Sequence, residues 1–256
     1  MTDRENNENN DGLTDFGFES IPREDKKHRV RGVFDSVAER YDLMNDLMSA
    51  GVHRLWKRIT IARSGLRPGD IALDIAAGSG DLSAGFAKQV GPSGKVFVTD
   101  INARMLSVGR DRLTDAGIVG NVEYLQVDAE RLPFKSRSFD CVSIGFGLRN
   151  VTDKAAALSS MLRVLKPGGK ALVLEFSHPH LGPLEPLYEF YSLQVLPRLG
   201  ELVLKDSDSY RYLAESIRKH PDQEELKALM IEQGFERCGY LNFSGGIVAL
   251  HTGYRI

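Results

Sequence analysis

Apolar residues occur in short blocks that change period between residues 71 and 176. Five continuous apolar runs predict buried strands, at 71–76, 95–100, 122–128, 139–146 and 171–176. After the first, second and fourth runs, apolar residues recur at spacings of three and four, which is typical of amphipathic helices. Strands that alternate with helices and are apolar throughout predict an α/β fold, with a doubly wound, mostly parallel sheet covered on both faces.

The segments on either side of this alternation have different patterns. Residues 1–15 are acidic and rich in asparagine, which predicts a disordered tail, and residues 16–256 are expected to form one domain. Residues 33–66 predict N-terminal helices, the first with an apolar face of Val33, Val37, Tyr41, Met44 and Met48. After the sheet core at 70–178, we expect a helical lid over a pocket at 179–233 and an antiparallel strand pair at 234–256.

Composition and charge restrict the classes of function. The formal net charge of −2 over 256 residues gives no basic footprint for nucleic acid. No apolar run reaches the roughly 18 to 20 residues that cross a bilayer, and the N-terminus lacks the apolar segment of a signal peptide. Two cysteines match no metal-ligand spacing, and Cys141 lies in an apolar run, so we expect it to be a buried hydrophobic residue. These features predict a soluble, cytoplasmic protein without a metal site.

A glycine-rich turn follows the first predicted strand, in the sequence LDIAAGSGDL. Gly78 and Gly80 allow a tight turn and a close approach of the backbone to a ligand, just before a helix N-terminus. A pair of glycines also occurs in ordinary tight turns. The dinucleotide fingerprint has a third glycine or alanine three residues further on, where this chain has Ser83. NAD is therefore disfavoured, although it stays open at this point.

Three predicted strands carry an aspartate at or near their carboxyl ends: Asp74, Asp100 and Asp128. Ligands of open parallel sheets bind beyond these ends. Asp100 can accept both hydroxyls of a ribose, in NAD and in S-adenosylmethionine alike. Asp128, followed by Ala129, offers an acceptor to an adenine amino group. Each aspartate alone could be a helix cap or turn residue, but three in register favour an adenosine-binding site.

Long segments of the chain resemble a known family. The region from Asp74 to Phe176 resembles the class I methyltransferase core, and the chain from about Phe16 onward resembles the ubiquinone/menaquinone biosynthesis C-methyltransferase family. The resemblance is carried by VFDSVAERYDLMNDLMSAGVHRLWKR, GFGLRNVTDKAAAL, MLRVLKPGG and DSYRYLAESIRKHPDQ. It implies a Rossmann-like sheet of seven strands, S-adenosyl-L-methionine as cofactor, and methylation of a ring carbon of a polyprenylated hydroquinone.

The resemblance also implies cofactor contacts at single positions. Ser79 stands where the family more often has threonine, Asp100 matches the ribose-binding acid, and Asp128 and Ala129 match the pair beside the adenine. Gly145 departs from the family, which usually has serine there, so a side-chain contact is missing. The complete predicted cofactor site is Asp74, Gly78, Ser79, Gly80, Asp100, Asp128 and Ala129.

The implied chemistry gives roles to Arg149 and Asn150, in the segment GFGLRNV. A hydroquinone carbon becomes nucleophilic when a neighbouring hydroxyl loses its proton, and a preorganised cation stabilises the phenolate that develops. We expect Arg149 to do this, directly or through a water that accepts the proton, and Asn150 to bind a ring oxygen. The alternative is that Arg149 pairs with an acid such as Asp153 and only anchors a helix.

Other residues have two interpretations. His220 suits a general base, but the Pro221-Asp222 sequence after it indicates a helix start, which favours a structural role. Tyr41 and Tyr210 are the predicted substrate-binding residues, and Tyr212 is a further one. Aromatic residues on amphipathic helices also pack in cores, so these assignments keep that alternative.

Two other functions share the same core: a small-molecule O- or N-methyltransferase, and a non-catalytic S-adenosylmethionine-binding subunit of a quinone-biosynthesis assembly. A nucleic-acid amine methyltransferase is disfavoured because GFGLRN contains no proline. The expected acceptor is a benzoquinol or naphthoquinol (2-polyprenyl-6-methoxy-1,4-benzoquinol and/or demethylmenaquinol). The basic helical face of Arg54, Lys57 and Arg58 is either solvated or in weak contact with the inner face of a membrane. Further expected partners are a quinone-biosynthesis complex or a second copy of the chain.

Overall fold

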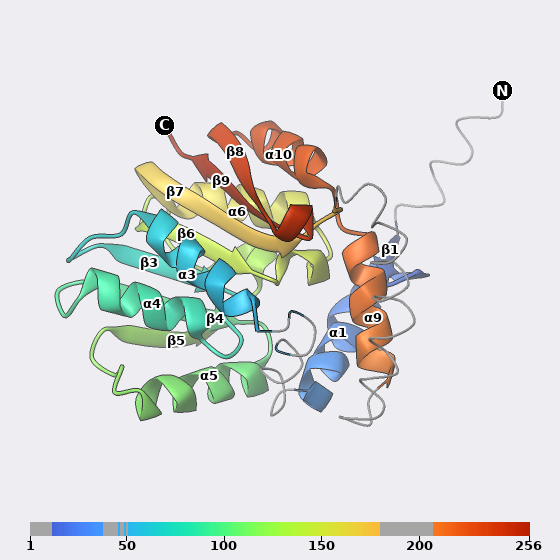
Figure 1. The fold of residues 1–256 in the computed structure, drawn as a ribbon, viewed down its shortest axis with the longest axis horizontal. Coiled ribbons are helices and arrows are strands. Elements are labelled where there is room, and N and C mark those ends of the chain that lie inside the picture. Colours follow the sequence, from blue (N-terminus) through green and yellow to red (C-terminus); the bar gives the residue numbers. More distant parts are fainter. Residues whose placement is uncertain (1–11, 38–45, 47–48, 50, 180–206) are drawn as a thin grey trace.

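The computed structural model describes residues 12–37, 46, 49, 51–179 and 207–256. Seven of the described strands form one sheet in the order β5-β4-β3-β6-β7-β9-β8, in which only β9 is antiparallel to its neighbours. These strands are β3 (Ile71–Ile75), β4 (Lys95–Asp100), β5 (Val122–Gln126), β6 (Phe139–Gly145), β7 (Leu165–Phe176), β8 (Glu236–Phe243) and β9 (Val248–Tyr254). The predicted doubly wound sheet and the predicted C-terminal strand pair are therefore confirmed (Figure 1).

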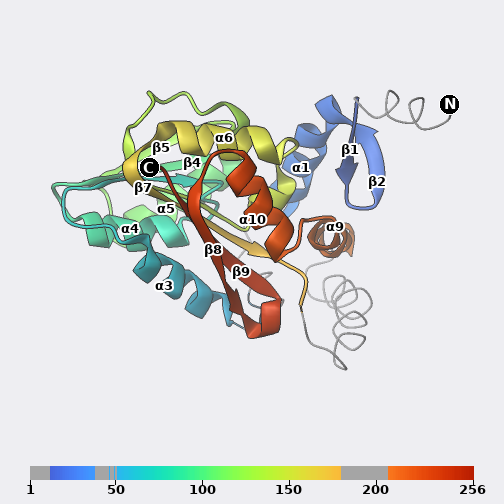
Figure 2. The ribbon, with the colours of Figure 1, turned by 90° about the horizontal axis from the view of Figure 1, so that it is seen from above.

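Helices cover both faces of the sheet (Figure 2). One face carries α3 (His53–Ser64), α4 (Asp81–Val90) and α5 (Ala103–Asp115), and the other carries α6 (Lys154–Val164) and α10 (Gln223–Glu232). Because successive strand residues point to opposite faces, continuously apolar strands supply two cores.

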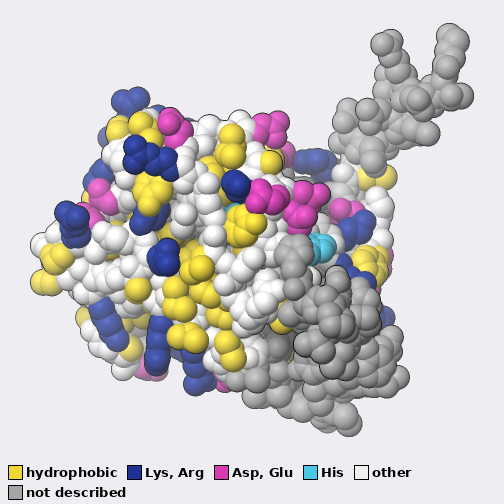
Figure 3. Space-filling model, turned by 45° about the horizontal axis from the view of Figure 1, so that its top comes forward, with side chains coloured by type: hydrophobic (Ala, Val, Ile, Leu, Met, Phe, Trp, Pro, Cys, Tyr) yellow, Lys and Arg dark blue, Asp and Glu magenta, His cyan; other side chains and the backbone are white. Residues whose placement is uncertain are grey.

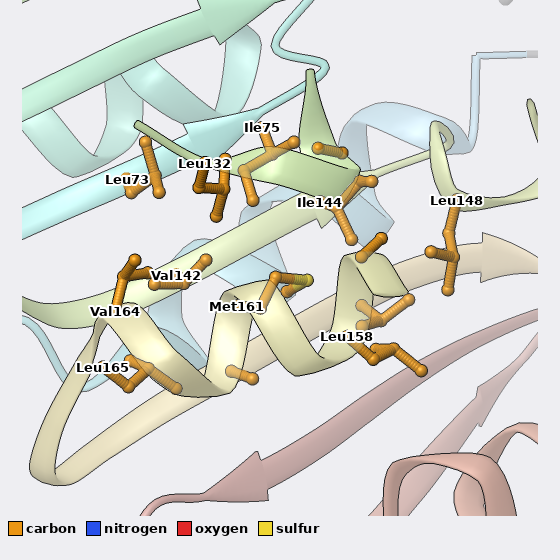
Figure 4. Packing of buried hydrophobic residues seen from close by; sticks show 14 of the residues in the cluster. Leu73, Ile75, Leu132, Val142, Ile144, Leu148, Leu158, Met161, Val164 and Leu165 are labelled. Atoms are coloured by element: carbon orange, nitrogen blue, oxygen red, sulfur yellow. The ribbon is translucent and has the colours of Figure 1, made fainter. Parts of the chain in front are cut away.

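The two cores divide neighbouring residues of the central strands between them. Leu73 and Val142 pack with Met161 of α6 (Figure 4), whereas Ala72 and Cys141 belong to the core on the α4 side. Cys141 is buried, as predicted, and burial raises the pKa of its thiol to about 12.

The N-terminal segment begins its regular structure earlier than the hydrophobic pattern predicts. Strands β1 (Leu13–Phe16) and β2 (Glu19–Pro22) form a hairpin, so the predicted tail ends before residue 13 and not at 15. Helix α1 (Arg23–Val37) begins at Arg23 and not at Val33. Its first turns, REDKKH, have no apolar stripe, because they dock through charged side chains. Tyr41, Met44 and Met48 lie outside the described residues.

The segment predicted as a helical lid contains two described helices with different positions. Of residues 179–233, the structure describes residue 179 and residues 207–233, which contain α9 (Ser207–Arg218) and α10. Helix α9 lies beside α1 and the hairpin (Figures 1 and 2). Helix α10, in contrast, buries Leu226 and Met230 in the core against the sheet. The apolar face of α10 therefore covers the sheet and not a pocket.

Candidate active site

Strained backbone marks the carboxyl ends of β3 and β6, the neighbouring strands at which the strand order reverses. Ala76 and Phe146 follow these strands with φ of 50° and 55°, in a left-handed conformation that is costly for residues other than glycine. A Cβ on Gly147 would lie 2.6 Å from the Cβ of Ala76. Such strain concentrates at functional sites, and both Ala76 and Phe146 line the two cavities found here.

The glycine-rich turn is fixed by close backbone contacts. Gly78 and Gly80 both have positive φ, and the N–H of Gly78 donates to Oδ2 of Asp100 over 3.0 Å. A Cβ on Gly109, in α5, would lie 2.6 Å from the carbonyl oxygen of Gly78. The structure thus brings the predicted glycines against the end of β4, as a ligand-binding turn requires.

The first cavity is a cleft of about 780 Å³, open mouth included, between this turn and α1. Asp100, Asp128 and Ala129 line it, in agreement with their predicted place. Burial raises the pKa of Asp100 to about 6, and its Oδ1 accepts the N–H of Asn102 over 2.8 Å. Each carboxylate oxygen can accept a second hydrogen bond, so Asp100 can still bind two hydroxyls. Lys27 of α1 lies 2.6 Å from Oδ2 of Asp128.

The second cavity, of about 360 Å³, lies on the other side of Ala76 and Phe146. Ser79 and Gly145 line it. A Cβ on Gly145 would lie 2.8 Å from Cδ1 of Leu82, so Leu82 limits the space that a side chain at this position would need.

Asp74 also borders the second cavity, but its carboxylate is already bound by the protein. Its two oxygens accept the hydroxyls of Ser83 and Ser143, and burial raises its pKa to about 6. The carboxyl therefore links β3 to α4 and β6. Asp74 thus has a structural role, and its predicted contact with the cofactor stays a prediction.

Arg149 is paired with an acid, as the alternative interpretation expected, but with a different one. Its side chain is 3% exposed and pairs with Glu175, which is 1% exposed, over 2.8 Å between Nη1 and Oε1. Nη1 also donates to the carbonyl of Phe146. The predicted alternative partner, Asp153, instead caps α6 and pairs with Arg23. Arg149 lines neither cavity, although its Nε has no hydrogen-bond partner.

Asn150 lines the first cavity and is held there by an aromatic residue of α9. The hydroxyl of Tyr212 donates to Oδ1 of Asn150 over 2.9 Å, and its ring stacks on Phe16 at 4.3 Å. Tyr210 is buried and lines neither cavity, so its substrate contact stays a prediction. Tyr41 lies outside the described residues. Of the two tyrosines that the structure describes, Tyr212 is the one hydrogen-bonded to a residue of the first cavity.

Comparison with known proteins identifies the chain. A model of the ubiE/COQ5 methyltransferase family matches residues 23–255. The chain belongs to this family. It is 60% identical to the ubiquinone/menaquinone biosynthesis C-methyltransferase UbiE of Vibrio cholerae, over 96% of this chain and 95% of the relative. It is also 60% identical to UbiE of Teredinibacter turnerae, over 95% and 98%. The predicted family is thus confirmed.

Solved structures agree with the fold of this ubiE/COQ5-family methyltransferase. A SAM dependent methyltransferase from Aquifex aeolicus matches 84% of this chain and 98% of its own, with a TM-score of 0.61 and 17% identity. A Haemonchus contortus phosphoethanolamine N-methyltransferase in complex with S-adenosyl-L-methionine matches 78% of this chain and 52% of its own, with a TM-score of 0.58 and 17% identity. At this identity the likeness concerns the fold alone.

Three features of the site in this ubiE/COQ5-family chain were not predicted. They are the ion pair between Lys27 and Asp128, the ion pair between Glu175 and Arg149, and the strained backbone at Ala76 and Phe146. His220, considered as a base, is buried without a partner for either ring nitrogen. Burial and nearby positive charges lower the pKa of His220 well below its ordinary value. His220 lines neither cavity, so its role as a base stays a prediction.

Proposed function

We propose that this chain transfers a methyl group from S-adenosylmethionine to a ring carbon of a polyprenylated hydroquinone in ubiquinone and/or menaquinone biosynthesis. The acceptor is a benzoquinol, a naphthoquinol or both. The observation that carries the proposal is the cleft at the switch point, where Asp100 and Asp128 meet in a chain 60% identical to UbiE relatives. S-adenosylmethionine, when bound, supplies a methyl group on a positively charged sulfur.

The residues of the first cavity fit an adenosine. Asp100 keeps acceptor capacity for the ribose hydroxyls, and Asp128 can accept from the adenine amino group beside Ala129. The strained Ala76 and Phe146 line both this cavity and the second one, so an elongated ligand that passes these two residues would occupy both cavities. The fit therefore includes both a nucleoside site and a continuation beyond it.

Asn150 is the proposed contact to the acceptor, whereas Arg149, which lines neither cavity, is proposed to act on the developing charge from behind it. Because Tyr212 donates to Oδ1 of Asn150, the amide N–H groups of Asn150 can donate to a ring oxygen. Glu175 balances the charge of Arg149, so Arg149 repels a cationic methyl donor less. The dipole of this ion pair can still stabilise a developing phenolate.

Transfer of labelled methyl groups tests the acceptor. Purified chain would be incubated with labelled S-adenosylmethionine and either 2-polyprenyl-6-methoxy-1,4-benzoquinol or demethylmenaquinol, with Asp100→Ala as control. Label in at least one quinol, lost in the control, supports the proposal. Label only in small phenols or amines would establish the O- or N-methyltransferase alternative, and cofactor binding without transfer would establish a non-catalytic subunit.

We further propose that the chain meets its acceptor at a membrane surface. Within the described ranges, no helix is long and apolar enough to cross a bilayer. At the start of α3, Val52 and Leu55 are 39% and 54% exposed beside Arg54, and on the face in Figure 3 hydrophobic side chains lie among Lys and Arg.

Leu55→Glu should weaken co-sedimentation with anionic vesicles, whereas Ile231→Glu, at a comparably exposed site on α10, should not. Equal binding of both variants would contradict this contact. Assembly with other proteins or a second copy stays a prediction.

A further inference from the structure

Lys57 lies on the same helix as two exposed arginines, but its ammonium group points into the protein. The side chain of Lys57 is 12% exposed, compared with 66% for that of Arg54. Its Nζ lies 2.7 Å from Oδ2 of Asp81, the first residue of α4. Lys57 therefore leaves the solvated basic face that the sequence predicts, and it lines the second cavity together with Asp81.

The second cavity adjoins the first one. Both are lined by Ala76 and Phe146, so a ligand whose ribose is bound by Asp100 would pass these residues into the space beside Lys57. The end of the proposed cofactor opposite its adenine is an α-amino acid, with one carboxylate and one ammonium group. A cation can bind this carboxylate, and an anion can bind this ammonium group.

We infer that Lys57 and Asp81 hold the amino-acid end of S-adenosylmethionine, Lys57 through the carboxylate and Asp81 through the ammonium group. The inference rests on the proposed function. A lysine ammonium has three donors, of which Asp81 takes one. Asp74, the other acid of this cavity, is already bound by Ser83 and Ser143.

The charge state of the pair supports this assignment. Burial alone would raise the pKa of Asp81, but the charge and hydrogen bond of Lys57 outweigh it and lower the pKa. Asp81 is therefore ionised at neutral pH. Arg112, 3.5 Å from Oδ1, gives Asp81 a second positive neighbour, so the carboxylate stays compensated when Lys57 turns toward a ligand. The competing interpretation is that Lys57–Asp81 only ties α3 to α4.

Calorimetric titration with two ligands separates these interpretations. S-adenosylhomocysteine carries the amino-acid end, and 5′-methylthioadenosine lacks it, while both carry the nucleoside. Lys57→Met should weaken S-adenosylhomocysteine binding by about 10- to 100-fold, the scale of one hydrogen bond between charged groups, and should change methylthioadenosine binding by less than about 2-fold. Lys57→Arg should restore most of the loss. Arg58→Met, which removes an exposed charge from the same helix, is the matched control.

Each outcome has one reading. A selective loss for S-adenosylhomocysteine supports the inference, because methylthioadenosine binding shows that the cleft is still folded. An equal loss for both ligands, with a lower melting temperature, would establish the structural tie, and unchanged binding of both would also overturn the inference. Selective loss in a protein that methylates no quinol would refute the proposed acceptor and leave Lys57 in place.

Discussion

Replacing Arg149 tests at once how the buried ion pair contributes to stability and to catalysis. Both side chains are almost fully buried. Removal of one partner leaves an uncompensated charge in the interior, which costs about 3 to 5 kcal/mol in such pairs. Arg149→Met should therefore lower the free energy of unfolding by about 3 to 5 kcal/mol. For a domain of this size, about 2 to 4 °C per kcal/mol gives a fall in melting temperature of about 6 to 20 °C.

The double variant Arg149→Met/Glu175→Leu separates the two contributions. It removes both charges and fills the space with apolar side chains, which is often close to neutral for stability. Its melting temperature should return most of the way to that of the wild type. If the Arg149 guanidinium stabilises the developing phenolate, turnover per folded molecule should still be lower by about 10² to 10³.

Thermal unfolding and methyl transfer would be measured on the same preparations of the two variants and the wild type. Calorimetric S-adenosylhomocysteine affinity should be nearly unchanged in the double variant, since Arg149 lines neither cavity. Normal turnover in the stable double variant would refute the catalytic role of Arg149. A double variant as unstable as Arg149→Met would instead refute the reasoning about the uncompensated charge.

Three further predictions concern the cofactor site and the tail. Asp100→Ala should weaken S-adenosylhomocysteine binding by about 2 to 4 kcal/mol. The folded pKa of Asp100 is raised to about 6, from about 3.9 in an unfolded chain. Ionised Asp100 therefore destabilises the fold above pH 6, and this cost disappears as the pH falls from 6 to 4. Calorimetry should show that cofactor affinity falls below pH 6, and that Asp100→Asn lacks this step. Gly109→Ala should lower the melting temperature, because its Cβ would meet the carbonyl of Gly78, whereas Gly32→Ala in α1, with open space around it, should raise stability by about 0.5 to 1 kcal/mol. Deletion of residues 1–11 should leave melting temperature and methyl transfer unchanged, since this segment is polar and asparagine-rich; a fall of several degrees would contradict this.

The fold and the proposed nucleoside half of the site were predictable from sequence because both depend on local pattern. Continuous apolar runs and helical periodicity define the strands and helices, and the carboxyl ends of parallel strands necessarily meet at one edge. Asp100 and Asp128 were therefore correctly placed together. Asp74 fits the same pattern, but the pattern gave no sign of its structural role, because the serine hydroxyls that it binds come from two other elements.

Charged side chains were misplaced where their partners lie far away in sequence. Hydrophobic periodicity carries no information on such pairs, so the predicted helix began at residue 33 and left out the charged start of α1, where Lys27 contacts Asp128, 101 residues away. Lys57 looked like part of a solvated face for the same reason. Its inward orientation depends on Asp81, 24 residues further on.

The sequence did not indicate that Glu175 is the partner of Arg149, but the strand order would have done so. Strand order places β7 beside β6, and Gly145 pairs with Leu174 in the parallel register. Residues that follow these two positions must lie at the same edge of the sheet, so Glu175 comes next to the loop that carries Arg149. A permanent cation beside a carboxylate in a buried site binds it, because neither charge can be left uncompensated in the interior. The chemistry of Arg149 is therefore set by the neighbouring strand, and any catalytic role must be exerted by an ion pair rather than by a free cation.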